Sequence, residues 1–259
     1  MSARVVLLDM DGVVWLAHRE IPGASAAVAT LRAAGTTVGF VTNNSFSTRA
    51  DQIGHLAAIG IDAGPHLFTS AMAASMVVEP GTRVFLCGGR GLAEELERVG
   101  AEVVVAHENR GIDRVDAVVV GLHREMDYGT VSDAARLVRH GARFIASNAD
   151  PVYPTPDGPV PGGGTVVAAI ETASGIAPLV TGKPHRTMVD LVESSLGRLD
   201  TGDVWFVGDR ADTDGGFAGA LGCRFAHVLS GTESTGDPTA DLIAADLASV
   251  VDQITGQGR

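Results

Sequence analysis

The amino-acid sequence predicts an α/β protein in which a parallel sheet forms a core and a second α/β domain is inserted into that core. Short apolar runs alternate with helical segments, and a run of four apolar residues such as 5–8 is typical of a strand buried on both faces. Polar, chemistry-bearing residues follow such runs in the first and last thirds of the chain, whereas the middle third lacks them. We therefore predict a core formed by residues 1–79 and 181–259, interrupted by an inserted domain at 80–180.

Each expected element is short and is bounded by turn-forming residues. The expected strands are mostly rich in valine and lie at 5–8, 38–41, 83–87, 103–105, 117–120, 144–147, 204–207 and 224–229. The expected helices end at glycine or before proline-containing turns and lie at 24–34, 48–59 (with Ser47 as its N-cap), 70–78, 91–99, 128–140, 166–174, 187–196 and 216–221. The Pro- and Gly-rich segment 148–164 is long for a connection, which indicates a functional loop.

Composition excludes several classes of protein. With 45% hydrophobic and 19% charged residues in 259, the chain is predicted to be globular, and its net charge of −12 argues against general affinity for nucleic acid or anionic membranes. Cys87 and Cys223 lie far apart in sequence, so a disulfide framework is not expected. No apolar run approaches the ~18 residues needed to span a bilayer. The N-terminal apolar run is broken by Asp9 and Asp11, unlike a signal peptide, and a cytoplasmic location is expected.

Carboxylates follow two of the core strands. Asp9 and Asp11 come directly after the run 5–8, and Asp209 and Asp214 come after the run 204–207. Carboxyl ends of parallel strands are where open α/β sheets place their chemistry, so these side chains are expected to converge. Converging carboxylates repel one another unless a cation is present, and oxygen ligands suit Mg²⁺. Taken alone, Asp9–Gly12 and Asp209–Asp214 could equally be charged turns.

Two further clusters have the chemistry of an anion site. Thr42 and Asn43 follow the second core strand, where a hydroxyl and backbone N–H groups can cradle phosphate oxygens. Lys183, in Gly182-Lys183-Pro184, can stabilise nearby carboxylates and neutralise a bound anion. A helix cap and a solvated loop charge are the plain alternatives for these two clusters. All the clusters stand at expected strand ends or loops in one consistent order, which favours a functional site.

That order resembles a known family. Asp9-Met10-Asp11-Gly12, Thr42-Asn43-Asn44, Gly182-Lys183-Pro184 and Gly208-Asp209 with Asp214 are similar to the four motifs of the haloacid dehalogenase (HAD) superfamily. The position of the insert, and Ser147-Asn148-Ala149-Asp150 followed by Pro161-Gly162-Gly163-Gly164, resemble its NagD/p-nitrophenylphosphatase-like branch, subfamily IIA with a C2-type cap. The resemblance covers about residues 5–230. It implies a Rossmann-like core, a cap domain and Mg²⁺-dependent phosphatase activity.

The resemblance also implies roles at the carboxylates. Asp9 is expected to attack phosphorus and form an aspartyl-phosphate, and Asp11 to act as general acid and then general base. Mg²⁺ is expected to bind Asp9, the backbone carbonyl of Asp11, and Asp209.

The remaining motif residues are implied to hold the phosphate. Thr42, Asn43 and Lys183 are expected to contact the transferring oxygens. Asp214 is expected to order Lys183 or a metal-bound water from outside the ligand set. Asp212 is extra to the motif and is expected to be an acid at the start of a helix, with contact to a metal-bound water as the open alternative.

Asp11 helps to choose among activities within the family. A halide leaves without a proton, whereas an alcohol leaving group needs one, so a phosphatase is favoured over a dehalogenase. A phosphomutase stays open, as does a catalytically silent module that binds a phosphometabolite, although none of the four motifs is damaged. Cap-mediated homodimers are an expectation from the family alone.

The substrate is not defined by the sequence beyond a small phosphorylated metabolite. Sugar or glycerol phosphate, phosphoglycolate, pyridoxal phosphate and nucleotides stay open. Candidate substrate contacts in the cap are Arg124, Asn148 and Asp150. The cap departs from the family pattern at Ser147 and Ala149, where Thr and Pro are usual, and at His123-Arg124, where an acidic residue is common. Arg124 could contact an anionic substrate or be a solvated surface charge.

Overall fold

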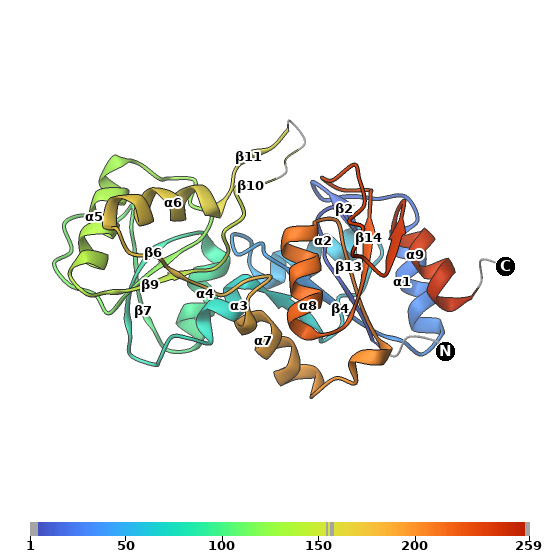
Figure 1. The fold of residues 1–259 in the computed structure, drawn as a ribbon. Coiled ribbons are helices and arrows are strands. Elements are labelled where there is room, and N and C mark those ends of the chain that lie inside the picture. The colour runs from blue at the N-terminus through green and yellow to red at the C-terminus, as the bar shows by residue number, and fades with distance from the viewer. Residues whose placement is uncertain (1–4, 154, 156–157, 257–259) are drawn as a thin grey trace.

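The computed structural model describes residues 5–256 except 154 and 156–157, and it contains two parallel sheets with helices packed on them (Figure 1). The ends of the predicted core, 1–4 and 257–259, and part of the predicted loop 148–164 therefore lie outside the described residues. The chain builds half of the first sheet, then the whole second sheet, and then returns to complete the first. No helix in the described part is long and apolar enough to cross a lipid bilayer.

The first sheet has six strands, and every neighbouring pair is parallel. In spatial order they are β15 (Leu242–Ala244), β14 (Arg224–Val228), β13 (Val204–Gly208), β1 (Val5–Leu8), β4 (Thr37–Thr42) and β5 (Leu67–Thr69). The chain adds strands to one side of β1 and later to the other, so the strand order reverses at β1. Such a switch point opens a crevice at the carboxyl ends of the central strands.

Alternate residues of the central strands belong to two hydrophobic clusters, one on each face of the sheet. Val6 and Leu8 pack on the face covered by α1 (Ala24–Ala33) and α9 (Leu247–Thr255), which lie side by side near the C-terminus in Figure 1. Leu7 packs on the opposite face with α7 (Arg186–Leu196) and α8 (Gly216–Leu221). Because both faces are covered, these strands consist almost entirely of apolar residues. Leu56 of α2 (Arg49–Ala58) joins the first cluster.

The second sheet has five parallel strands. Their order is β12 (Leu179–Val180), β9 (Arg143–Ala146), β8 (Ala117–Val120), β6 (Arg83–Cys87) and β7 (Glu102–Val105). One face packs on α5 (Tyr128–Arg139) and α6 (Gly163–Ser174), and the other on α4 (Arg90–Arg98) and α3 (Ser70–Ser75). Because Ala73 of α3 contacts the core cluster while Ala71 and Ala74 contact this one, α3 links the two sheets.

Two small antiparallel hairpins complete the fold. One pairs β2 (Trp15–Leu16) with β3 (Arg19–Glu20), and the other pairs β10 (Val152–Tyr153) with β11 (Val160–Pro161). The second hairpin projects at the top of Figure 1, beside the junction between the sheets. The α/β class with a parallel core is confirmed. The domain boundaries at residues 80 and 180 stay predictions, and the strands of the second sheet run from Arg83 to Val180.

Several expected elements were wrong in detail. The strands β5, β12 and β15 were not predicted, because two- and three-residue strands carry too little pattern to detect. The nine-residue helix α9 was also not predicted, although its apolar residues have helical spacing. The helix α2 is capped by Thr48 and not Ser47, since Thr48 forms a reciprocal capping box with Asp51. The helix α6 starts at Gly163, three residues earlier than expected. The helix α8 is preceded by one turn of π-helix, Ala211–Gly215.

Candidate active site

The chemistry-bearing strand ends meet at one edge of the first sheet. Asp9 directly follows β1, Thr42 is the last residue of β4, and Asp209 directly follows β13. All three line one pocket, at the switch point between β1 and its neighbours. The same pocket is lined by the other predicted core residues Asp11, Asn43 and Lys183, and by Asn148 and Asp150 from the second domain.

Lys183 lies between two buried carboxylates. Its Nζ is 2.7 Å from Oδ1 of Asp9 and 2.7 Å from Oδ1 of Asp214, and all three side chains are buried. Burial raises the pKa of Asp9, and the ammonium of Lys183 opposes that shift. Burial alone lowers the pKa of Lys183, but the carboxylates of Asp214 and Asp9 outweigh it and raise that pKa. Lys183 therefore stays charged, and it supplies the positive charge that a bound anion meets.

Asn43 fixes the backbone that carries Lys183. Its Oδ1 accepts a 2.8 Å hydrogen bond from the N–H of Lys183, and its Nδ2 donates to the carbonyl of the same residue at 3.2 Å. The carbonyl of Asn43 accepts in turn from Nδ2 of Asn148 at 2.8 Å and from Oγ of Ser70 at 2.6 Å. Oγ1 of Thr42 accepts from the N–H of Asn44 at 3.0 Å. The turn after β4 is thus held by both the core and the second domain.

Asp209 is held from three sides. Its Oδ2 accepts from the N–H of Thr232 at 2.7 Å and from Oγ1 of Thr232 at 2.9 Å. Cβ atoms added at Gly12 or Gly231 would collide with this carboxylate, so both glycines are needed for its close packing. Burial raises the pKa of Asp209, and the charge of Asp214 adds to the shift.

The carboxylate of Asp214 binds other residues of the site. Its Oδ2 accepts hydrogen bonds from the N–H groups of Asp209 at 3.0 Å and Arg210 at 3.1 Å. Its Oδ1 accepts a hydrogen bond from the ammonium of Lys183. Both oxygens are therefore engaged by the protein. Of the two roles expected for Asp214, the structure shows the contact that orders Lys183.

Asp11 lines the same pocket, at the start of the turn after β1. Its Oδ1 accepts a 3.0 Å hydrogen bond from Nε1 of Trp15, whose side chain is buried. Burial raises the pKa of Asp11 to about 6, although the hydrogen bond from Trp15 lowers it. A carboxyl group with that pKa can both give and take a proton near neutral pH.

Comparisons with known proteins agree with this geometry. A family model described as haloacid dehalogenase-like hydrolase matches residues 6–102, and a second, described as HAD-hydrolase-like, matches residues 180–255. An acid sugar phosphatase from Staphylococcus aureus is 32% identical, over 90% of this chain and 89% of the relative. The chain belongs to the haloacid dehalogenase-like hydrolases.

Other members of this family are also similar. A D-glycerol 3-phosphate phosphatase from Mycobacterium tuberculosis is 36% identical over 90% of this chain, which spans 64% of that relative, slightly less than two thirds. The solved structure of a p-nitrophenyl phosphatase from Archaeoglobus fulgidus has a TM-score of 0.87 at 29% sequence identity. The match covers 98% of this chain and 100% of the phosphatase chain. These names support the predicted enzyme class, a phosphoric monoester hydrolase.

A solved relative also bears on the metal. A glycerol phosphate phosphatase from M. tuberculosis, in complex with magnesium, has a TM-score of 0.84 at 34% identity, covering 96% of this chain and 76% of its own. For a member of the haloacid dehalogenase-like hydrolases, this supports a divalent metal ion at the carboxylate cluster.

The carboxylate cluster of this chain fits such an ion. One oxygen from each of Asp9, Asp209 and Asp214 lies within 4.8 Å of the other two, and all three residues are buried. Among the described residues, protein donors engage only Oδ1 of Asp9 and only Oδ2 of Asp209, which leaves one oxygen of each for a metal ion. Oxygen donors at this density suit a hard divalent cation.

The predicted cap contacts are only partly brought to the site. Asn148 and Asp150 line the pocket, whereas Arg124 does not; its guanidinium stacks over the Phe46 ring, 4.5 Å from the centroid. Phe46 lines the pocket, so Arg124 touches its wall from outside. Asp212 forms a paired contact with Arg210 at 2.8 and 3.1 Å and has an exposed side chain, as expected for an acid outside the ligand set.

Sequence reasoning did not name Trp15, Tyr153 or Thr232 as site residues, although Tyr153 lies in the segment 148–164 that was predicted to be a functional loop. Tyr153 reaches the pocket from β10, and its hydroxyl accepts a 3.2 Å hydrogen bond from Nδ2 of Asn44. Thr232 follows β14, so the rule that strand ends carry chemistry could have found it. Trp15 carried no such signal, because an apolar ring near a strand is usually part of the core.

Proposed function

We propose that this chain is a Mg²⁺-dependent phosphatase that hydrolyses a small phosphorylated metabolite through an aspartyl-phosphate intermediate. The observation that carries the proposal is the placement of Asp9, Lys183 and Asp209 together at the carboxyl edge of the core sheet, in one pocket with Asp11. We keep the predicted cytoplasmic location and a homodimer as parts of this proposal.

The proposed chemistry has two steps. A carboxylate oxygen of Asp9 attacks phosphorus, the bond from phosphorus to the ester oxygen breaks, and Asp11 gives its proton to the leaving oxygen. A water molecule then attacks the aspartyl-phosphate, Asp11 takes a proton from it, and inorganic phosphate leaves with Asp9 regenerated. The pKa of Asp11, raised to about 6 by burial, suits both roles.

The remaining residues would bind the metal ion and the phosphate oxygens. Asp9, Asp209 and the backbone carbonyl of Asp11 would hold Mg²⁺, which when bound offsets the repulsion between phosphate and carboxylate. The ammonium of Lys183 and the hydroxyl of Thr42 would face the transferring oxygens. Asn43 keeps Lys183 in position through the two hydrogen bonds to its backbone. Since phosphoryl transfer depends mainly on positioning and charge stabilisation, these contacts carry much of the expected rate enhancement.

The second domain limits the size of the substrate. Leu122, Asn148, Asp150 and Tyr153 line the pocket opposite the core residues. A pocket walled on that side favours a small leaving group over a phosphorylated protein surface. Sugar or glycerol phosphates, phosphoglycolate, pyridoxal phosphate and nucleotides are the candidate substrates, and the two phosphatase relatives named for a substrate favour glycerol and sugar phosphates among them.

The decisive experiment is phosphate release from a panel of these metabolites and from p-nitrophenyl phosphate, in the presence of Mg²⁺. We expect release that is abolished by EDTA and by Asp9→Asn, a nearly isosteric change that removes the nucleophile. Asp190→Asn is the matched control, because Asp190 is exposed and its one ion-pair partner in the described part of the chain is Arg186 on α7. No release from any substrate would refute the phosphatase and favour a silent binding module, while retained activity in Asp9→Asn would refute the nucleophile.

A further inference from the structure

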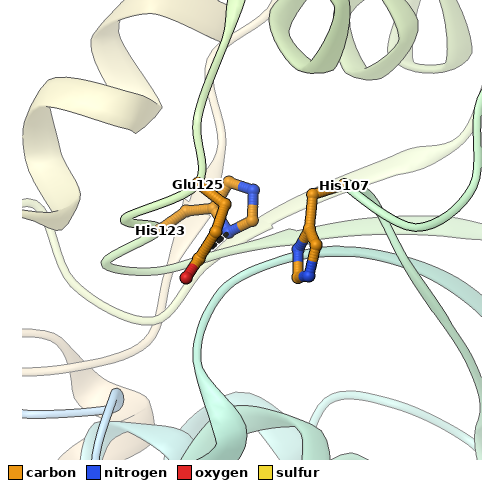
Figure 2. A group of neighbouring side chains, drawn as sticks. All are labelled: His107, His123 and Glu125. Carbon is orange, nitrogen blue, oxygen red and sulfur yellow. Dashed lines mark ion pairs between the residues drawn. The ribbon is translucent and has the colours of Figure 1, made fainter.

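A second group of candidate ligands lies in the inserted domain, away from the carboxylate cluster. His107 follows β7, while His123 and Glu125 follow β8, so the three residues meet at the carboxyl edge of the five-stranded sheet. Figure 2 shows the His107 ring facing the pair formed by His123 and Glu125. None of the three lines the candidate active site.

His123 is the unusual member of this group. Its side chain is completely buried, with 0% exposed, and neither ring nitrogen has a hydrogen-bond partner among the described residues. The Gly88 backbone lies near the ring and favours its charged form, but it forms no hydrogen bond of acceptable geometry with it. Burying an unpaired polar group costs about 1–3 kcal/mol, so native proteins usually provide a partner. An ion that accepts a nitrogen lone pair would be such a partner.

The other two residues supply further donors within reach. Oε2 of Glu125 is 3.9 Å from Nδ1 of His123, and the ring centroids of His107 and His123 are 5.5 Å apart. One ligand atom from each of the three residues lies within 4.8 Å of the other two. Donors around a tetrahedral zinc ion are closer, roughly 3.3 Å apart given bonds of about 2.0–2.1 Å. The side chains of His107 and Glu125 are 34% and 56% exposed, so they can turn inward, and solvent reaches the site through them.

The charges around the group favour a cation. Glu108 places Oε1 3.8 Å from Nε2 of His107, which adds a second carboxylate beside the donors. Two cations lie nearby and both are engaged: the guanidinium of Arg110 pairs with Asp127 at 2.7 Å, and that of Arg124 stacks over the Phe46 ring. Burial lowers the pKa of His123, so its ring is neutral at pH 7 and can donate a lone pair.

We propose that His107, His123 and Glu125 form a binding site for a divalent transition-metal ion of the zinc class. The two imidazoles are borderline donors, which suit Zn²⁺ better than Mg²⁺ or Ca²⁺, and two histidines with one glutamate form a ligand set that zinc accepts, with the fourth position left for water. The ion would join the segment after β7 to the segment after β8. The second segment also carries Leu122, which lines the candidate active site, and Arg124, which stacks on Phe46.

The site can be tested on the full chain saturated with Mg²⁺, which occupies the carboxylate cluster. We expect isothermal titration with Zn²⁺ to give one site per chain that millimolar Mg²⁺ does not displace, and Co²⁺ to give the visible absorption bands of a tetrahedral site. His107→Gln and Glu125→Gln each remove an exposed ligand, and each is expected to weaken Zn²⁺ binding by about 10- to 100-fold. The matched control is His140→Gln, an exposed histidine at the end of α5 in the same domain.

Two results would overturn the proposal. One is the absence of a Zn²⁺ site in the Mg²⁺-saturated wild-type chain. The other is Zn²⁺ binding that persists unchanged in both His107→Gln and Glu125→Gln, which would place the ion elsewhere, such as at His18 and His55, whose ring centroids are 4.0 Å apart. Both variants change exposed side chains, so circular dichroism is expected to show the wild-type fold.

Discussion

The indole of Trp15 holds the carboxyl group of Asp11, with a hydrogen bond of 3.0 Å from Nε1 to Oδ1. The turn between them is closed by the backbone, since the N–H of Gly12 donates to the carbonyl of Trp15 at 2.7 Å. A buried ring therefore fixes the direction of the group that we propose as general acid and base. Trp15 touches neither Lys183 nor Asp209 in the described hydrogen bonds, so its effect on chemistry should pass through Asp11 alone.

The first prediction concerns this hydrogen bond. Trp15→Phe keeps an aromatic ring in the core but removes the N–H that lowers the pKa of Asp11. Loss of one hydrogen bond of about 1 kcal/mol is expected to raise that pKa by a little under one unit. We expect kcat for glycerol phosphate to fall several-fold and the alkaline limb of its pH profile to move upward. Trp205→Phe, at the far end of β13, is the control, and an unshifted limb in Trp15→Phe would contradict the positioning role.

The second prediction is the pH profile of the wild-type enzyme. Burial raises the pKa of Asp11 from 3.8 to about 6, so the proton needed by the leaving group is present below pH 6 and is lost above it. The rate on alkyl phosphates is therefore expected to fall above about pH 6, by up to tenfold per unit. Nitrophenolate leaves without a proton, so p-nitrophenyl phosphate should show little of this limb. Identical profiles for the two substrates would rule out Asp11 as the acid.

The third prediction separates the metal ligands from their neighbours. Asp209→Asn removes a charge from the carboxylate cluster, and the Mg²⁺ concentration for half-maximal activity is expected to rise by at least about tenfold. Asp212→Asn, three residues further on, removes an exposed carboxylate paired with Arg210 and should leave that concentration unchanged. Equal metal dependence in the two variants would remove Asp209 from the ligand set.

Much of the site could be predicted from the sequence, because its residues stand at strand ends. The runs before Asp9, Thr42 and Asp209 are buried strands, and parallel strands bring their carboxyl ends to one edge. Residues that follow these strands in the sequence therefore lie close together in the structure. The C-terminal helix could also have been found, since Leu247, Val250 and Val251 have helical spacing.

The rest depended on turn geometry and tertiary contacts that no helix or strand period predicts. Trp15 reaches Asp11 through the tight backbone turn that Gly12 closes, and Tyr153 reaches Asn44 across 109 positions. Arg124 was a candidate substrate contact, but its guanidinium stacks on the ring of Phe46. Because Phe46 is far from Arg124 in sequence, no local pattern indicates this contact. The unpaired ring of His123 likewise becomes visible only once its burial is known.

The last prediction concerns Gly12, which combines backbone strain with close packing. Gly12 has φ of +86°, and a Cβ there would lie 2.5 Å from Oδ2 of Asp209. Gly35 has a similar φ of +80° but no atom within 4 Å of its Cβ position, so Gly35→Ala measures the backbone strain alone. Both alanine variants should lose about 1–2 kcal/mol of unfolding free energy from the left-handed conformation. Only Gly12→Ala should also displace Asp209 and raise the Mg²⁺ concentration for half-maximal activity. Chemical denaturation and metal titration of both variants would separate the two effects, and an unchanged metal dependence in Gly12→Ala would show that Asp209 need not occupy this position.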